Sequence, residues 1–420
     1  MEVVAKNITK GAASAPKPTE PGLSQHLRAR IEREFRARFE NEWGRRFVTH
    51  GSVPGPDAVR LDGNDYLAVT GHEAIVAAQV AALRSNTDFV VQSGVFQLDG
   101  SPHAALESLL AGFVGKQGAL LCQSGYTANL GLIQVVADPQ TPVYVDSLAH
   151  MSLWEGVRAA GATAHPFRHN DPGHFAKMAA RHGPGLLIVD SVYSTTGALC
   201  PLQAMVEAAE AHGCMVLVDE SHSLGTHGPQ GRGLCAQLGL SHRVHFITAS
   251  LAKAFAGRAG FFTMPDELRH YLMCHSYPSV FSSCLLPHEI AGLVATLDVV
   301  RDSDDARLRL RRNTVRLRAS LAEAGYPIQH GSEQIISLEA GPEADTLALR
   351  DALEQRGVVG AVFCAPATSR NRAMVRLTLN AGLTDAELGH VEAVARELAP
   401  VVKPWDWGIA RRLRGAGAAA

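Results

Sequence analysis

The chain has 420 residues, of which 46% are hydrophobic and 19% are charged, and its formal net charge is −2. This balance is typical of a globular protein with a large core and room for two domains, and it excludes a polycation that binds nucleic acid or an acidic membrane surface by charge alone. Seven cysteines occur without a C-x-x-C pair, which indicates neither a disulfide framework nor a cysteine zinc site and favours a reducing cytoplasm.

The first region of the chain, residues 1–58, is predicted to be a leader and a helical arm. Residues 1–22 lack the apolar stretch of a signal peptide, and we interpret them as disordered. Residues 24–43 are predicted to form a helix that docks on the protein body. Its apolar side chains recur every four residues: Leu27, Ile31, Phe35 and Phe39. A basic amphipathic membrane helix is the alternative, which the interspersed glutamates disfavour.

Residues 59–290 alternate between apolar runs and helix-like segments. The runs lie at 118–122, 142–146, 185–190, 215–219, 244–249 and 259–264. Such alternation predicts a mostly parallel sheet with helices on both faces, and ligands bind beyond the carboxyl ends of such strands. No apolar run in the sequence is long enough to span a bilayer, so stable membrane insertion is not expected.

The C-terminal part is predicted to form a smaller domain over residues 291–405. Residues 291–325 are predicted to be one long helix, and the runs QIISLEA and MVRLTLN are typical of strands. Residues 406–420 are expected to be a frayed tail.

Lys253 is the last residue of the stretch TASLAK, which follows directly from a predicted buried strand. A lysine in a partly apolar pocket can lose its proton near neutral pH, and it can then form a Schiff base with an aldehyde such as pyridoxal phosphate. This hypothesis requires partners for the cofactor's ring nitrogen, ring oxygen, flat face and phosphate.

Candidates for the ring partners lie at predicted strand ends. Asp219 ends the run MVLVD, where its carboxylate would keep the pyridine nitrogen protonated, although it could instead cap the next helix. His222 could contact the ring oxygen and His150 could stack on the ring, although a lone histidine is more often a core or loop residue.

Candidates for the phosphate lie where a predicted helix begins. Ser124, Gly125 and Tyr126 open a helix after the run GALLC, and free N–H groups at a helix N-terminus favour a phosphate. Ser250 could add a hydroxyl, as could Ser283 in the distant loop VFSSCLLP. Nineteen histidines also raise the alternative of a metal site, but no H-E-x-x-H occurs and no metal is expected.

The order of these motifs along the chain resembles that of the α-oxoamine synthases. The matching stretches are SGYTAN, DSVYS, VDESHSLG, TASLAK and FSSCLLP. The resemblance implies an α/β fold-type I pyridoxal-phosphate-dependent transferase, with a mostly parallel seven-stranded sheet in the large domain and a smaller C-terminal α+β domain. It implies an acyltransferase that joins an amino acid to an acyl-CoA, and a homodimer with the active site at its interface.

Longer stretches resemble one branch of that family, the quorum-sensing autoinducer synthases. They include AHMSLWEG, VDESHSLGTHGPQGRGL and VFCAPATSRN. The resemblance implies condensation of a medium- or long-chain acyl-CoA with S-adenosylmethionine or 2-aminobutyrate, which gives an α-aminoketone signal precursor. Ala149-His150 and Leu286-Pro287 stand where the wider family usually has Asn-His and Pro-Pro, and both departures agree with this branch.

The resemblance also assigns roles to residues of this chain. Lys253 is implied to be the Schiff-base lysine and the base, with Asp219, His222 and His150 in the ring roles above. Further implied cofactor contacts are Ser124, Gly125, Tyr126, Asp190, Ser194, Ser250 and, from the other subunit, Ser283. Asn64 and Arg376 are implied to hold the amino acid, for which a bidentate arginine is well suited.

Other functions remain open at this point. An α-oxoamine synthase that uses glycine, alanine or serine would share every motif, and an aminotransferase or lyase would share Lys253 and Asp219. A cofactor-binding regulator is disfavoured, because the reacting groups are complete and no DNA-binding module is recognisable.

Overall fold

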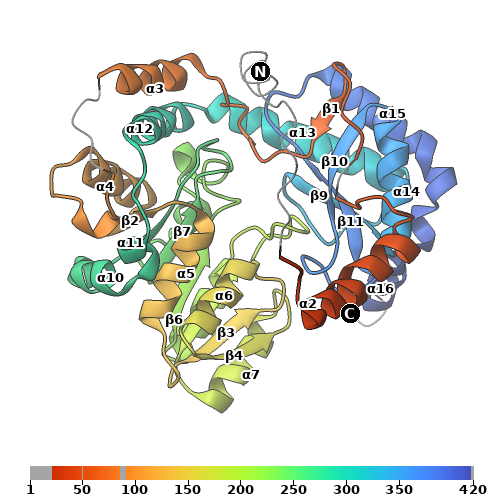
Figure 1. The fold of residues 1–420 in the computed structure, drawn as a ribbon. Coiled ribbons are helices and arrows are strands. Elements are labelled where there is room, and N and C mark those ends of the chain that lie inside the picture. Colours follow the sequence, from red (N-terminus) through yellow and green to blue (C-terminus); the bar gives the residue numbers. More distant parts are fainter. Residues whose placement is uncertain (1–20, 50, 86–90, 418–420) are drawn as a thin grey trace. The chain divides into compact units, whose positions relative to one another are not determined.

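The computed structural model describes residues 21–49, 51–85 and 91–417, and it divides into an N-terminal unit that ends at His50 and a main unit from Gly51 onward. The predicted leader therefore lies almost wholly outside the described residues. Figure 1 follows the chain by colour from one terminus to the other.

The N-terminal unit contains the predicted helix. α2 spans Gln25–Ile31, and its first turn is capped by the Ser24 hydroxyl, which accepts a hydrogen bond from the Leu27 N–H at 3.2 Å. The helix continues as π-helical turns over Glu32–Arg36 and Arg38–Glu42. An aromatic cluster of this unit includes Phe35 and Phe39, whose ring centroids lie 5.4 Å apart. The predicted helix is confirmed, and its docking on the protein body stays a prediction.

The large domain is built on a seven-stranded sheet in the order β2-β8-β7-β6-β5-β3-β4. Its strands are β2 (Gly118–Cys122), β3 (Pro142–Asp146), β4 (Thr163–Phe167), β5 (Leu186–Asp190), β6 (Met215–Asp219), β7 (Phe246–Ser250) and β8 (Gly260–Met264). Only β8 runs against its neighbours β2 and β7, and the pairs among β7, β6, β5, β3 and β4 are parallel. The predicted mostly parallel, seven-stranded sheet is confirmed.

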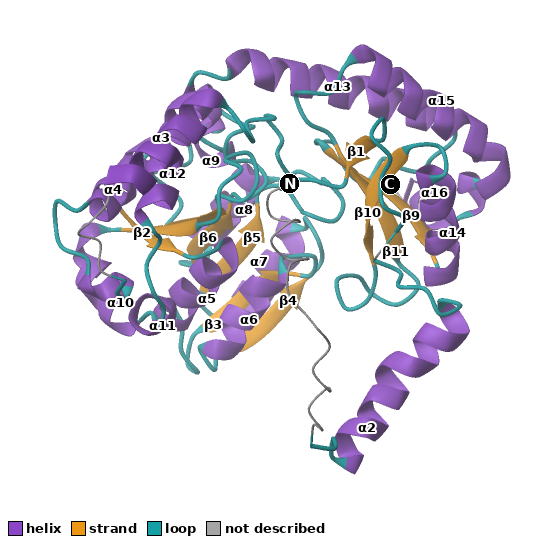
Figure 2. Cartoon of the chain, turned by 45° about the horizontal axis from the view of Figure 1, so that its top comes forward, coloured by secondary structure: helices purple, strands orange, loops and turns teal. Residues whose placement is uncertain are grey.

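Helices cover both faces of this sheet, as Figure 2 shows. Alternate strand residues point to two separate apolar clusters, since successive side chains of a strand face opposite sides. One face is covered by α5 (Gly125–Val136), α6 (Met151–Ala159) and α10 (Arg269–His275). The other is covered by α4 (Pro102–Val114), α7 (Pro172–His182), α8 (Leu202–Ala211), α9 (Leu234–Gln237) and α12 (Pro287–Arg301). α3 (Glu73–Ser85) packs on α12, and α11 (Tyr277–Phe281) follows α10.

The small domain is built on a four-stranded sheet in the order β1-β10-β11-β9. Its strands are β1 (Val59–Leu61), β9 (Ile335–Gly341), β10 (Val358–Phe363) and β11 (Ala373–Thr378). α13 (Asp304–Glu323), α14 (Glu343–Glu354), α15 (Asp385–Val402) and α16 (Gly408–Gly417) accompany it. β1 pairs in parallel with β10, so residues 59–61 belong to the smaller sheet although the sequence placed them in the large domain.

Two sequence predictions in this region are wrong. The single helix over 291–325 is two helices, because α12 ends at Arg301 and α13 begins at Asp304. The expected frayed tail instead contains the helix α16. Trp407, just before this helix, and Ile409 and Ala410 in its first turn are buried, which holds the helix in place. Strands β1, β4 and β10 were also missed, and all three contain exposed or half-buried positions, which weaken the apolar pattern.

Candidate active site

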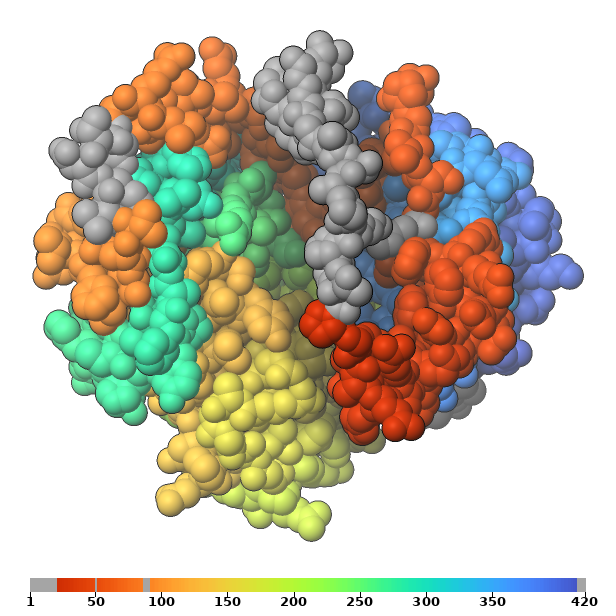
Figure 3. Space-filling view, viewed as in Figure 1, coloured from red at the N-terminus to blue at the C-terminus, as the bar shows by residue number. Residues whose placement is uncertain are grey.

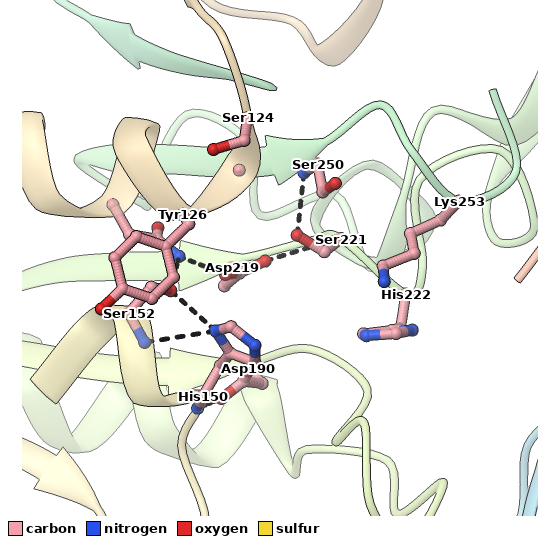
Figure 4. A pocket seen from close by; sticks show the side chains of 12 residues that line it. Ser124, Tyr126, His150, Ser152, Asp190, Asp219, Ser221, His222, Ser250 and Lys253 are labelled. Carbon is pink, nitrogen blue, oxygen red and sulfur yellow. Dashed lines mark hydrogen bonds between the residues drawn. The ribbon is translucent and has the colours of Figure 1, made fainter. Parts of the chain in front are cut away.

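The carboxyl ends of four neighbouring strands gather the polar residues of the site. Asp146, Asp190, Asp219 and Ser250 end β3, β5, β6 and β7. Because parallel strands end at the same edge, three of these groups, Asp190, Asp219 and Ser250, line one cavity of about 210 Å³ at that edge (Figure 4). The cavity is lined by Ser124, Gly125, Tyr126, Asn129, His150, Ser152, Asp190, Asp219, Ser221, His222, Ser250 and Lys253.

Lys253 extends into this cavity from the turn after β7, beside His222 (Figure 4). Burial and, to a smaller degree, the nearby Arg376 guanidinium lower the pKa of Lys253 to about 8, against the opposing effect of Asp219. An amine with this pKa is partly neutral at physiological pH and can attack a carbonyl carbon or accept a proton.

Asp219 is held as a hydrogen-bond acceptor. Its Oδ1 accepts the Ser221 N–H at 2.8 Å, and its Oδ2 accepts the Asn129 side-chain amide at 2.7 Å. The register of the sheet places Asp190 beside it. Burial and the Asp219 carboxylate raise the pKa of Asp190 well above its usual range. The two aspartates therefore differ in their chemistry, and Asp219 is the one suited to bind a cationic ring nitrogen.

Burial favours the neutral form of both histidines of the cavity. Burial and the charges of Lys253 and Arg376 hold the pKa of His222 well below its usual range, and the Tyr66 hydroxyl lies 2.5 Å from its Nδ1. Burial also lowers the pKa of His150, whose backbone N–H donates to Asp190 Oδ2 at 3.0 Å. A neutral imidazole can donate or accept one hydrogen bond without adding charge to the cavity.

The N-terminus of α5 forms a cradle for an anion. Ser124 caps this helix and accepts the Thr127 N–H at 3.2 Å, while the N–H groups of Gly125 and Tyr126 have no acceptor within the helix. A Cβ on Gly125 would lie 2.6 Å from the Ser250 Cβ, so only glycine allows β7 to approach this closely. The residues present therefore fit the phosphate, ring nitrogen and aldehyde of pyridoxal phosphate.

A second group of residues is joined by Arg376. Its guanidinium donates to the Asn64 side-chain oxygen and to the Ser194 carbonyl, both at 3.0 Å. It also lies 4.4 Å from the ring centroid of Phe363. Arg376 is only 4% exposed, and its Nε is buried without a hydrogen-bond partner among the described residues. An arginine so fixed is suited to bind a carboxylate.

Comparison with known proteins identifies the family of this chain. The family model described as aminotransferase class I and II matches residues 56–393. The chain belongs to this family. A CAI-1 autoinducer synthase of Vibrio campbellii is 44% identical over 381 residues, which are 91% of this chain and 97% of that protein. A 5-aminolevulinate synthase of Cereibacter sphaeroides is 30% identical, over 83% of this chain and 86% of that protein.

Solved structures agree with this assignment. A serine palmitoyltransferase of Sphingomonas wittichii superimposes with a TM-score of 0.76 and 27% identity, covering 82% of this chain and 88% of that chain. A second serine palmitoyltransferase structure, which contains pyridoxal phosphate, has a TM-score of 0.78 and 25% identity, covering 90% and 98%. The predicted fold, the α-oxoamine synthase relationship and the pyridoxal-phosphate dependence of the family are confirmed, and the chain is an enzyme.

The structure brings most of the predicted site residues of this family member together. Nine of them line the cavity: Ser124, Gly125, Tyr126, His150, Asp190, Asp219, His222, Ser250 and Lys253. Asn64, Ser194 and Arg376 form the adjoining group. Ser283 is exposed, and its carbonyl accepts a hydrogen bond from the side chain of Gln123, next to Ser124. The individual roles of these residues stay predictions.

Sequence reasoning missed four residues of the site: Tyr66, Asn129, Ser152 and Ser221. The Ser221 hydroxyl accepts the Ser250 N–H at 2.8 Å, and Tyr66 is fully buried against His222. The signal that could have drawn attention to Asn129 is a polar residue among apolar ones in the helix sequence ANLGLI.

Two further findings concern the alternatives raised by the sequence. Within the described ranges, no helix is both long and apolar enough to cross a membrane. No group of three histidine, cysteine, aspartate or glutamate side chains in the same ranges is arranged to hold a metal ion.

Proposed function

We propose that this enzyme condenses a medium- or long-chain acyl-CoA with S-adenosylmethionine or 2-aminobutyrate to give an α-aminoketone signal precursor. The observation that carries the proposal is the buried Lys253, with a pKa of about 8, in the same cavity as Asp219 and the α5 N-terminus. The 44% identity to a CAI-1 autoinducer synthase over nearly the whole chain supports the choice of acyl transfer and of this product class.

Pyridoxal phosphate is the cofactor that these residues would hold. The α5 N-terminus and Ser250 would bind its phosphate, Asp219 its ring nitrogen, and Lys253 its aldehyde carbon. When bound, the cofactor supplies a protonated ring that stabilises negative charge at the α-carbon of an attached amino acid.

The chain's own residues then bind the amino acid and move its proton. Arg376, held by Asn64, binds the substrate carboxylate. The neutral Nζ of Lys253 takes the proton from the α-carbon. The α-carbon then attacks the acyl thioester, and CoA leaves as its thiolate. Loss of CO2 leaves an electron pair on the α-carbon, which takes the proton from Lys253 Nζ to give the aminoketone. His222 and His150 stay neutral throughout, since burial opposes their protonation.

We also infer a homodimer in which Ser283 of one subunit approaches the phosphate in the other. Support comes from a face with exposed apolar side chains around α3, α11 and the segment before α4: Val76, Val80, Leu83, Phe96, Leu98, Tyr277 and Phe281. These elements adjoin along one side of Figure 3, and α11 packs on residues 94–96. An apolar face of this kind favours association.

The seven free cysteines agree with a reducing cytoplasm.

The experiment that tests the proposal is product analysis by mass spectrometry. Purified enzyme with pyridoxal phosphate is offered acyl-CoAs of graded length against S-adenosylmethionine, 2-aminobutyrate, glycine, alanine and serine, and free CoA thiol is measured in parallel. An aminoketone from either of the first two donors supports the proposal. Product from glycine, alanine or serine alone assigns the enzyme to another α-oxoamine synthase activity. Absence of CoA release with bound cofactor favours an aminotransferase or lyase.

The dimer is tested by light scattering and by subunit complementation. Lys253→Ala and a Ser283→Trp variant are each expected to have little activity, and mixed subunits should regain part of it, because one of the two sites in a heterodimer then carries neither change. A monomer in solution, or mixed subunits without regained activity, would contradict the shared site.

A further inference from the structure

A buried chain of hydrogen bonds connects Asp219 to His150. The Asn129 side-chain nitrogen lies 2.7 Å from Asp219 Oδ2 and 2.8 Å from the Ser152 hydroxyl oxygen, which lies 2.7 Å from His150 Nδ1. Asn129 is 1% exposed and Ser152 is fully buried. Figure 4 shows the dashed lines that meet at Asp219, Ser152 and His150.

The amide orientation of Asn129 follows from its neighbours. Its Nδ2 faces a carboxylate oxygen and a hydroxyl oxygen, so the two amide protons can satisfy both acceptors. The reversed orientation would place Oδ1 against Asp219 and leave two acceptors in contact without a proton. Oδ1 instead lies on the other side, buried without a hydrogen-bond partner among the described residues. Asn129 therefore donates in both directions.

This orientation fixes the proton of Ser152. Because the hydroxyl oxygen accepts from Asn129, its single proton is free to be donated to His150 Nδ1. The Ser152 backbone N–H approaches the same Nδ1 at 3.3 Å. Since both groups at Nδ1 are donors, this nitrogen must be an acceptor, and the ring proton of a neutral His150 lies on Nε2.

The charged groups around His150 have opposite effects on its pKa. Asp219 favours the cationic ring and Lys253 opposes it, while the His150 backbone N–H donates to Asp190. His222 interacts with His150 from the loop after β6. Burial is the largest of these influences and lowers the pKa of His150, which agrees with the neutral ring that the hydrogen bonds require.

We propose that Asn129 and Ser152 are positioning residues that orient the Asp219 carboxylate and hold His150 as a neutral ring protonated at Nε2. Neither residue needs to touch the substrate for this role. The proposal rests on the proposed function in one respect, because it assigns His150 and Asp219 to the face and ring nitrogen of pyridoxal phosphate.

The proton position is tested directly by NMR on holoenzyme labelled with 15N-histidine. Long-range proton–nitrogen correlations distinguish the two neutral ring forms, and the His150 signal is identified by its loss in His150→Gln. We expect Nδ1 unprotonated and Nε2 protonated at pH 7.5. A proton on Nδ1 of the wild-type enzyme would overturn the proposal without any variant being made. Repeating the measurement on cofactor-free enzyme keeps this result independent of the proposed function.

Variants then test the positioning role. In Ser152→Ala, loss of the donor to Nδ1 should raise the pKa of His150 by about one unit, measured by titration of the same signal. Ser152→Thr keeps a hydroxyl and should restore the wild-type titration. Ser191→Ala is the matched control, because Ser191 is also fully buried, and its hydroxyl bonds to the Asp219 carbonyl and to Ser223 rather than to His150. An unchanged titration in Ser152→Ala would overturn the role of Ser152.

Cofactor affinity supplies a further readout. Asn129→Ala removes one donor to Asp219, and the Kd for pyridoxal phosphate, from fluorescence titration, should rise about tenfold. Wild-type affinity in Asn129→Ala would contradict the role of Asn129 at Asp219. If the wild-type enzyme itself does not bind pyridoxal phosphate, the proposed function fails, and the NMR result still decides the proton arrangement.

Discussion

The two domains both bury charged side chains, but they treat these charges differently. In the small domain, Glu339 is 1% exposed and its two oxygens accept hydrogen bonds from Arg372 and Arg412. At the edge of the large sheet, burial instead lowers the pKa of Lys253 and raises the pKa of Asp190, so that the neutral form of each is favoured. A buried charge that is paired with opposite charges connects elements of the fold. A buried group without full counter-charge has a shifted pKa and can exchange protons near neutral pH.

Substitution of the shifted lysine should give the largest effect. Lys253→Ala is expected to lower turnover by about 1,000-fold or more, because it removes the only amine that lines the cavity in the described chain. The measurement is CoA release, with circular dichroism to confirm folding. Lys116→Ala is the matched control. Lys116 also has a pKa lowered by burial, but its amine donates to the Ser241 and Val244 carbonyls outside the cavity. Equal losses in both variants would remove the distinction between the two lysines.

Substitution of the arginine that links the two domains should have the next largest effect. Arg376→Lys keeps a positive charge but loses the planar pair of donors, so kcat/KM for the amino acid should fall about 10- to 100-fold. Acyl-CoA KM should change little, because the carboxylate belongs to the other substrate. Arg243→Lys is a control, since its guanidinium pairs with the exposed Glu210 carboxylate. A selective rise in acyl-CoA KM would contradict the assignment.

The pH dependence of cofactor capture should show the shifted lysine directly. With a pKa of about 8, the neutral fraction of Lys253 rises with pH, so the rate at which cofactor-free enzyme reacts with pyridoxal phosphate should increase about tenfold between pH 7 and pH 9. Stopped-flow absorbance measures this rate. A rate that continues to rise by tenfold per pH unit up to pH 10 would indicate an unshifted lysine.

The paired charge should affect stability and leave chemistry almost unchanged. Glu339→Gln leaves Arg372 and Arg412 without their counter-charge, and the free energy of unfolding in urea should fall by about 1–3 kcal/mol. Turnover of the folded enzyme should stay within about twofold. Glu397→Gln, which removes an exposed pair with Arg356, should cost less than about 1 kcal/mol. A large loss of turnover in Glu339→Gln would show that paired charges also tune the site.

Much of the large domain could be predicted from the sequence because its strands are buried on both faces. Each of β2, β3, β5, β6, β7 and β8 is a nearly continuous apolar run, and polar residues such as Asp190 and Asp219 mark the ends. β4 was missed, because TAHPF has exposed and half-buried positions. The small sheet is also less regular, since β1 comes from residues 59–61, almost 300 positions before its partner β10.

The sequence by itself determined which reactive side chains the enzyme has and the order in which they follow the strands along the chain. Local patterns carry that information, because apolar runs define strands and motif order identifies a family. Only the tertiary structure decided that Asn129, Ser152 and Tyr66 belong to the site, that Arg376 acts on Lys253, and that the C-terminal segment is a docked helix. These facts depend on hydrogen bonds and burial between residues far apart in the chain, and no local pattern encodes such distances.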